Sequence, residues 1–358
     1  MENKSSAQSH ESFIDWMKAT GMILILIGHV FGSPHVLFNS VTAPIYSKQL
    51  GVAFFIFIAG WGLAHNQRDR AETAYRRLFD LLFFGSIFAV FMSAVTWFQA
   101  RDLAESNYLP LMLGANVFFN YFPANPTTWY IGMYTQLIVL WWWLMPRRVA
   151  LWMLPVALVV EIAARALILE ADRAFTAYMS VSNWVSVFLL GFLLADRRDH
   201  RRPIAGLALL VAWMGALLYW NWGHENMAFD GSFPTRFGKG EWLSPWLVST
   251  LVSVMYLVNT VFAFFVFRSF RAPAPIRFIA RHTLFIFILH MPLIYASANW
   301  IYGFSSVPLI ARSMLIVFVL VTLALLSAFV HRLLPVAHLR DAVWKRLKHL
   351  TPRAHAGA

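Results

Sequence analysis

An apolar segment near the amino terminus carries three ionisable side chains at a spacing that suits proton-transfer chemistry. Asp15, Lys18 and His29 lie in the stretch FIDWMKATGMILILIGH. Lys18 and His29 are eleven residues apart, which in a helix is within about 20° of three full turns and about 16 Å along the axis. Asp15 lies one turn before Lys18 on the same face. The segment therefore predicts a helix with one polar stripe that points into the protein.

His29 has two interpretations on the sequence alone. An ionisable side chain inside an apolar helix costs about 2.5–3.5 kcal/mol in a membrane unless it has a partner or a function. Histidine titrates near neutral pH, so His29 suits a general base that takes a proton from an acceptor hydroxyl. Alternatively, it only forms a hydrogen bond to a neighbouring helix.

Basic residues follow the second apolar run, at Arg68, Arg70, Arg76 and Arg77. Four positive charges suit phosphate groups, although they also fit the bias of basic residues toward the cytoplasmic side of a membrane. Arg76 and Arg77 abut the next apolar run.

His290 precedes Pro292 in a late apolar run. Proline can loosen a helix and free backbone carbonyls, so His290 is interpreted either as a second site histidine or as a structural one. Glu161 and Arg165 are four residues apart, which favours an ion pair within a helix. We interpret this pair primarily as structural and, as the second alternative, as part of a site that binds the substrate that accepts the transferred group.

The elements that must position these residues are membrane helices. Hydrophobic residues make up 59% of the 358-residue chain and charged residues only 13%, too little polar surface for a soluble domain. The apolar runs predict an all-α polytopic membrane bundle of about ten transmembrane helices. We place these spans at about 17–33, 50–65, 78–99, 129–145, 150–170, 182–196, 203–222, 246–268, 282–303 and 308–331.

The basic residues predict the orientation of this bundle. Alternate joints and both ends carry 22 of the 29 Lys and Arg residues, so both termini are expected in the cytoplasm. The apolar stretch 109–122 is too short to cross, and we interpret it as re-entrant or interfacial. Residues 1–331 are expected to form one membrane domain, followed by a basic cytoplasmic tail at 332–358 without regular structure.

Composition also excludes several kinds of chemistry. The chain contains no cysteine, which rules out disulfides, thiolate metal sites and a cysteine nucleophile. The net charge of +12 lies in short clusters between apolar runs, so it indicates membrane topology rather than nucleic-acid binding. We expect neither a metal nor a nucleic-acid partner.

Four segments in order resemble the acyltransferase 3 family of membrane acyltransferases. They are Lys18 to His29, the run Phe54 to Gly60, Trp129 with Tyr130, and Phe287 to Pro292. The opening looks most like the branch labelled fucose 4-O-acetylase-like. Lys18 stands where the family usually has Arg, so the positive charge is kept but the planar fork is lost. Ala59 stands where the family usually has Ser.

The resemblance implies an O-acyltransferase, most simply an O-acetyltransferase. Acetyl-CoA or another acyl-CoA is the implied donor, and a hydroxyl of a glycan, glycolipid or other extracytoplasmic acceptor is the implied target. His29, Lys18 and Asp15 are the implied catalytic group. Arg76 and Arg77 stand where the family carries an arginine pair, so the resemblance implies that they bind the coenzyme together with Lys18. Trp129, His290 and Glu161 are the candidates for acceptor binding. The implied location is the bilayer of a bacterial inner (plasma) membrane.

Two other classes of protein stay open on the sequence. A transporter or flippase for an anionic or glycolipid substrate would use His29, Lys18 and Glu161 to relay protons or line a path. A non-catalytic membrane scaffold would tolerate His29→Ala.

Overall fold

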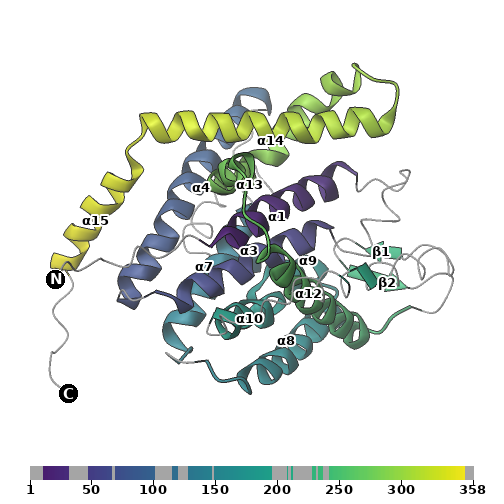
Figure 1. Ribbon diagram of the computed structural model, residues 1–358, viewed down its shortest axis with the longest axis vertical. Helices are drawn as coiled ribbons and strands as arrows, with labels where there is room; N and C mark the ends of the chain where they lie inside the picture. The colour runs from purple at the N-terminus through teal and green to yellow at the C-terminus, as the bar shows by residue number, and fades with distance from the viewer. Residues whose placement is uncertain are drawn as a thin grey trace.

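Helix α1 (Ser12–Val30), which carries the three ionisable side chains, runs through the middle of the molecule beside α3 (Ser47–Ala64) (Figure 1). This computed structural model describes residues 11–31, 47–66, 69–100, 115–119, 128–146, 149–195, 208, 211–212, 228–230, 233–236 and 242–350.

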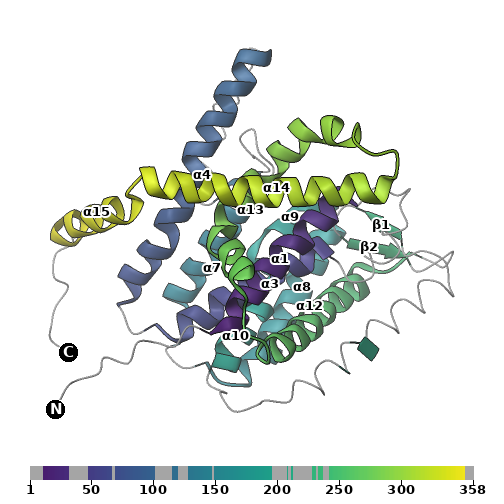
Figure 2. The same ribbon diagram turned by 45° about the horizontal axis from the view of Figure 1, so that its top comes forward.

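The other helices surround this central pair (Figures 1 and 2). They are α4 (Arg70–Ala100), α6 (Asn116–Phe119), α7 (Trp129–Trp143), α8 (Met153–Glu170), α9 (Ala174–Met179), the 3-10 helix η3 (Val181–Asn183), α10 (Val185–Ala195), α12 (Pro245–Phe267), α13 (Ala274–Tyr302), α14 (Pro308–Leu333) and α15 (Val336–Leu350). The short strands β1 (Ala228–Asp230) and β2 (Phe233–Arg236) pair antiparallel; apart from this pair, the regular elements described are helices, as predicted.

Glycines set how closely α3 packs against its neighbours. A Cβ atom on Gly21 of α1 would lie 2.9 Å from the carbonyl oxygen of Gly51 in α3. On the other side of α3, a Cβ atom on Gly60 would meet the carbonyl oxygen of Phe188 in α10. Helices approach this closely only where small residues face each other. Gly60, the last residue of the Phe54–Gly60 segment, therefore has a packing role.

Apolar side chains cover the outside of the bundle as well as its core. Along α14, Val317, Val321, Leu325 and Phe329 follow one another at four-residue intervals and are all exposed. A continuous exposed apolar stripe of this kind is not stable in water and fits a lipid-facing surface.

The structure supports a membrane bundle but not the full count of ten spans. Four helices in the described part of the chain, α1, α12, α13 and α14, are long and apolar enough to cross a bilayer. The shorter apolar helices are 48–64 and α10. Nine predicted spans overlap a helix, whereas 203–222 falls almost entirely outside the described residues, as does most of the re-entrant segment 109–122.

The tail differs from the prediction, because residues 336–350 form α15 rather than an irregular segment. The helix turns away from the end of α14 in both views (Figures 1 and 2). Its Val336 is buried in a cluster with Phe84, Phe285 and Ile288, and Trp344 stacks on Tyr75 at 5.0 Å between ring centroids. These few apolar contacts stabilise the helix. The sequence did not predict them, because basic residues dominate the composition of the tail.

Candidate functional site

A pocket of about 500 Å³ opens into the bundle from the end at which α4 and α13 begin. It is lined from six helices, α1, α3, α4, α7, α13 and α15. Its lining includes charged and aromatic side chains, namely Lys18, Arg76, Arg77, Asp80, Arg340, Phe55, Tyr130, Tyr134 and Phe287. Four of these side chains are cationic and only Asp80 is anionic, so the pocket has a net positive charge. We call the part lined by Lys18, Arg76, Arg77 and Arg340 the basic end.

Arg77 points into the bundle from the start of α4. Its guanidinium forms a hydrogen bond with the hydroxyl of Tyr134 on α7 and interacts electrostatically with Lys18. It lies close to α3, because a Cβ atom on Gly62 would be 2.7 Å from its Nη2 atom. The glycine therefore leaves the room that this guanidinium occupies.

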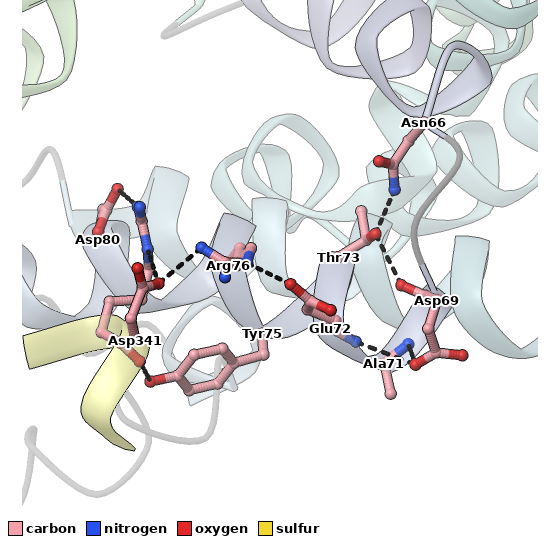
Figure 3. Close-up of polar contacts among 10 residues, drawn as sticks. Asn66, Asp69, Ala71, Glu72, Thr73, Tyr75, Arg76, Asp80 and Asp341 are labelled. Carbon is pink, nitrogen blue, oxygen red and sulfur yellow. Dashed lines mark hydrogen bonds and ion pairs between the residues drawn. The ribbon is translucent and has the colours of Figure 1, made fainter. Parts of the chain in front are cut away.

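Arg76 also lines the pocket, but two carboxylates hold it (Figure 3). Its Nε atom donates to Glu72 at 2.7 Å, and its Nη1 atom donates to Asp341 of α15 at 2.7 Å. Of the predicted coenzyme-binding pair, Arg77 is thus the member directed inward and Arg76 is the member that joins α4 to α15.

Nearby, the start of α4 is fixed by its own cap (Figure 3). The carboxylate of Asp69 accepts hydrogen bonds from the backbone N–H groups of Ala71 and Glu72 at 3.0 and 3.2 Å. Thr73 donates to the backbone carbonyl of Asp69 and accepts from Asn66. Capping at this position stabilises the first turn of a helix, so the two arginines project from a fixed turn.

An aromatic wall closes the inner end of the pocket. Phe287 of α13 lies 4.7 Å from Tyr130 and 6.3 Å from Phe55, measured between ring centroids. The same Phe287 ring lies 5.8 Å from the ring of His290. Phe287 therefore separates the pocket from His290.

Beyond this wall, two histidines lie side by side. The ring centroids of His29 and His290 are 5.1 Å apart. The Nδ1 atom of His290 is 2.7 Å from the backbone carbonyl oxygen of Phe287. Because a carbonyl can only accept, Nδ1 carries the proton in the neutral ring, and Nε2 presents a lone pair. Nε2 is buried and has no hydrogen-bond partner within the described part of the chain, so His290 is equipped to accept a proton or a hydrogen bond.

His29 lies in the last turn of α1, because that helix begins at Ser12 and ends at Val30. Its side chain is accessible, in contrast to the fully buried His290. Lys18 and His29 both face α13, one at the basic end and the other beside His290. Lys48 is an electrostatic neighbour of His29.

The remaining predicted site residues lie outside the pocket lining. Asp15 is buried on α1 and interacts electrostatically with Lys18. Trp129 packs against Tyr178 and Trp184, whereas the adjacent Tyr130 reaches the pocket.

Glu161 belongs to a separate buried network. Its Oε1 atom accepts from Ser253 at 2.7 Å, and its Oε2 atom accepts from the backbone N–H of Ser186 at 2.8 Å. Arg165, 3.4 Å from Glu161, donates from all three of its nitrogens, and its further partners are Asn183, Ser249 and Ser253. These bonds support the structural interpretation of the pair.

Several pocket residues were not identified from the sequence. Tyr134 and Phe287 look like ordinary helix residues, because nothing in the local pattern shows which face is turned toward a pocket. Arg340 lies in the tail that was expected to lack structure. Tyr130 and Phe287 did fall within the segments that carry the family resemblance, and that was the available signal. Among the described residues, no group of His, Asp and Glu side chains could hold a metal ion.

Comparison with known proteins gives one match. The model of a family described as an acyltransferase domain matches residues 11–331. No curated protein and no solved structure matches the chain.

Proposed function

Because the chain belongs to the acyltransferase 3 family and is therefore a membrane acyltransferase, we propose that it transfers an acetyl group from acetyl-CoA to a hydroxyl of a glycan, glycolipid or other extracytoplasmic acceptor. The observation that carries this proposal is the alignment of the basic end, the aromatic wall and the histidine pair along one face of α13. The similarity of its opening to the fucose 4-O-acetylase-like branch favours a sugar hydroxyl.

The basic end suits the donor. Coenzyme A is a polyanion with a diphosphate and a further phosphate, and charge-assisted hydrogen bonds to guanidinium groups are the strongest protein contacts to phosphate. Arg77 and Lys18 line the pocket together, with Arg77 fixed by Tyr134. The thioester arm would then extend toward Phe287, with the acyl group at the aromatic wall.

The histidine pair suits the reaction itself. His29 takes the proton from the acceptor hydroxyl as its oxygen attacks the thioester carbonyl. The new C–O bond forms, the C–S bond breaks, and the proton on His29 passes to the leaving thiolate of coenzyme A. His290 accepts a hydrogen bond from the acceptor through its unpaired Nε2 atom. A positioned base of this kind contributes about 10²–10⁴-fold to a rate.

The aromatic wall favours a short acyl group. Phe287 contacts Tyr130 on one side and His290 on the other, so an acyl group that reaches the histidines must pass or displace its ring. An acetyl group requires the smallest displacement. Longer acyl-CoA donors are expected to react more slowly.

The direction of transfer follows from the proposed topology. With both termini in the cytoplasm, the basic end faces the cytoplasm, where coenzyme A occurs. His29 lies in the last turn of α1, at the opposite end from the charged start of that helix, which suits an acceptor that arrives from the other side of an inner membrane. The family match lends no support to a transporter or flippase.

Transfer in proteoliposomes tests the proposal. Purified protein is incubated with labelled acetyl-CoA and a panel of glycans and glycolipids, and label is followed into the acceptor. Acetyl-CoA-dependent labelling that is absent from His29→Ala vesicles is expected. Failure with every acceptor, in protein that melts cooperatively, would overturn the acetyl-CoA assignment.

A further inference from the structure

The carboxyl-terminal helix α15 supplies part of the pocket wall, although it lies beyond the residues matched by the family model. That match ends at residue 331, and α15 begins at Val336. Arg340, one turn into α15, lines the pocket together with Arg76 and Asp80 of α4. The tail therefore contributes a cation to the basic end.

Several contacts hold α15 against α4. The hydroxyl of Tyr75 donates to the backbone carbonyl of Arg340 at 2.8 Å, and the Tyr75 ring stacks on Trp344. Arg76 pairs with Asp341 at 2.7 Å (Figure 3). Contacts to backbone, ring and carboxylate all lie within about two turns of α15. The position of Arg340 is thus fixed relative to the pocket.

The guanidinium of Arg340 is held along one edge and is free of hydrogen bonds along another. Its Nη1 atom donates to the Oδ2 atom of Asp80 at 2.7 Å. Its Nε atom is buried and has no hydrogen-bond partner among the described residues; its ion-pair distance to the Oδ1 atom of Asp341 is 3.9 Å. A buried guanidinium donor that makes no hydrogen bond is costly. The Arg340 side chain as a whole is 22% exposed and lines the pocket, so a small rotation of the guanidinium would bring this donor to an anionic ligand.

We propose that Arg340 is a donor-binding residue that contacts a phosphate of the acyl-CoA, and that α15 is part of the donor site. This inference depends on the proposed function for the identity of the ligand. Asp80 acts as a positioning residue: it contacts the guanidinium of Arg340 and not the ligand, and it fixes the orientation of that guanidinium, as residues behind a binding group do at metal sites.

The chemistry favours a phosphate over a single charge such as a carboxylate. Arg340 joins Arg76, Arg77 and Lys18 around one pocket. Asp80 in the lining and the carboxylates of Glu72 and Asp341 that pair with Arg76 offset three of these four charges, and the remaining positive charge fits a polyanion. Arginine presents a planar fork of donors to phosphate, whereas lysine presents a point charge. Lys18 presents only a point charge to the pocket, and Arg340 provides a fork that a lysine lacks.

Binding of coenzyme A alone tests the inference separately from transfer. Titration calorimetry on the full chain in detergent should show that Arg340→Ala raises the Kd for coenzyme A about tenfold and that Arg340→Lys raises it less. Arg346→Ala is the matched control, because Arg346 is exposed on the same helix; we expect its Kd to stay within twofold of wild type.

Hydrogen exchange on the wild-type protein provides a measurement that needs no variant. Saturating coenzyme A should slow amide exchange in residues 336–350. Unchanged exchange there, or equal Kd values for Arg340→Ala and wild type, would overturn the role of Arg340 while acetyl transfer remained intact. If wild type neither binds coenzyme A nor transfers acetyl groups, the proposed function fails and this inference fails with it.

Discussion

Two groups of polar side chains lie within the same apolar bundle and differ in how their hydrogen bonds are used. In the buried network of Glu161 and Arg165, both carboxylate oxygens accept and every guanidinium nitrogen donates to protein atoms. In the histidine pair, His29 is accessible, and the Nε2 atom of the buried His290 has no hydrogen-bond partner among the residues that the structure describes.

Whether a polar side chain has all its hydrogen bonds to protein atoms distinguishes structural from functional residues better than its charge or its burial does. A buried charged group that already makes all its hydrogen bonds to protein atoms cannot form further ones with a ligand. A buried acceptor without a hydrogen bond destabilises the protein, and a ligand that donates to it removes that cost. Glu161 and His290 are both candidate acceptor-binding residues on the sequence. The structure gives them different surroundings, and mutations at each should have different consequences.

The largest expected effect is on turnover. His29→Ala should lower kcat for acetyl transfer by about 10²–10⁴-fold, because the proton acceptor is lost, while the melting temperature in detergent changes little. The matched control is His282→Ala, which removes a histidine that bonds Ser327 away from the pocket and should keep kcat within twofold. Near-normal turnover in His29→Ala would remove this residue from the mechanism.

Next in size is an effect on stability. Arg165→Met should destabilise the protein by about 3–5 kcal/mol, because it leaves Glu161 buried without its cation. Denaturant or thermal melts measure the loss, and the folded fraction should retain kcat/KM within twofold. Glu170→Gln, at an exposed carboxylate that accepts from Trp246, serves as the control and should change stability by less than about 1 kcal/mol. If Arg165→Met lost activity without losing stability, the network would be part of the acceptor site, and it would no longer differ in role from the histidine pair.

A smaller effect concerns Lys18 at the basic end. Lys18→Met should raise the KM for acetyl-CoA about tenfold, because a positive charge leaves the pocket. Lys18→Arg should stay within about threefold of wild type, since the charge is kept. Acetyl-CoA saturation curves distinguish the two variants. Equal kinetics for Lys18→Met and wild type would show that this position only marks the membrane boundary.

The smallest expected effect comes from Gly62. Gly62→Ala places a methyl group where the guanidinium of Arg77 lies, so the side chain must shift, and the KM for acetyl-CoA should rise about threefold, roughly 0.7 kcal/mol. The double-mutant cycle with Arg77→Ala checks the cause. In the Arg77→Ala background, the Gly62 substitution should have no further effect on KM; an additive effect would show that Gly62 acts through helix packing instead.

The sequence predicted the helices well because apolar runs and their breaks are local signals. It also predicted that Lys18 and His29 share a face, since helical geometry alone fixes that relation. It did not predict the pairing of His29 with His290, because contacts between helices far apart in sequence leave no periodic pattern. It also missed α15, whose few apolar contacts with Phe84 and Tyr75 are masked by the surrounding charge.

The close backbone contacts of α3 have a mechanical consequence for the pocket. Gly51 fixes α3 to α1, and Gly60 fixes it to α10, so two neighbouring backbones hold this wall from opposite sides. The wall formed by α4 and α15 is held instead by side-chain contacts: ion pairs, one aromatic stack, one hydrogen bond from Tyr75 and a small apolar cluster around Val336. Separating ion pairs at a half-exposed surface takes far less work than separating interlocked backbones. If the pocket widens to admit a bulky coenzyme, we expect α4 and α15 to move and α3 to stay in place.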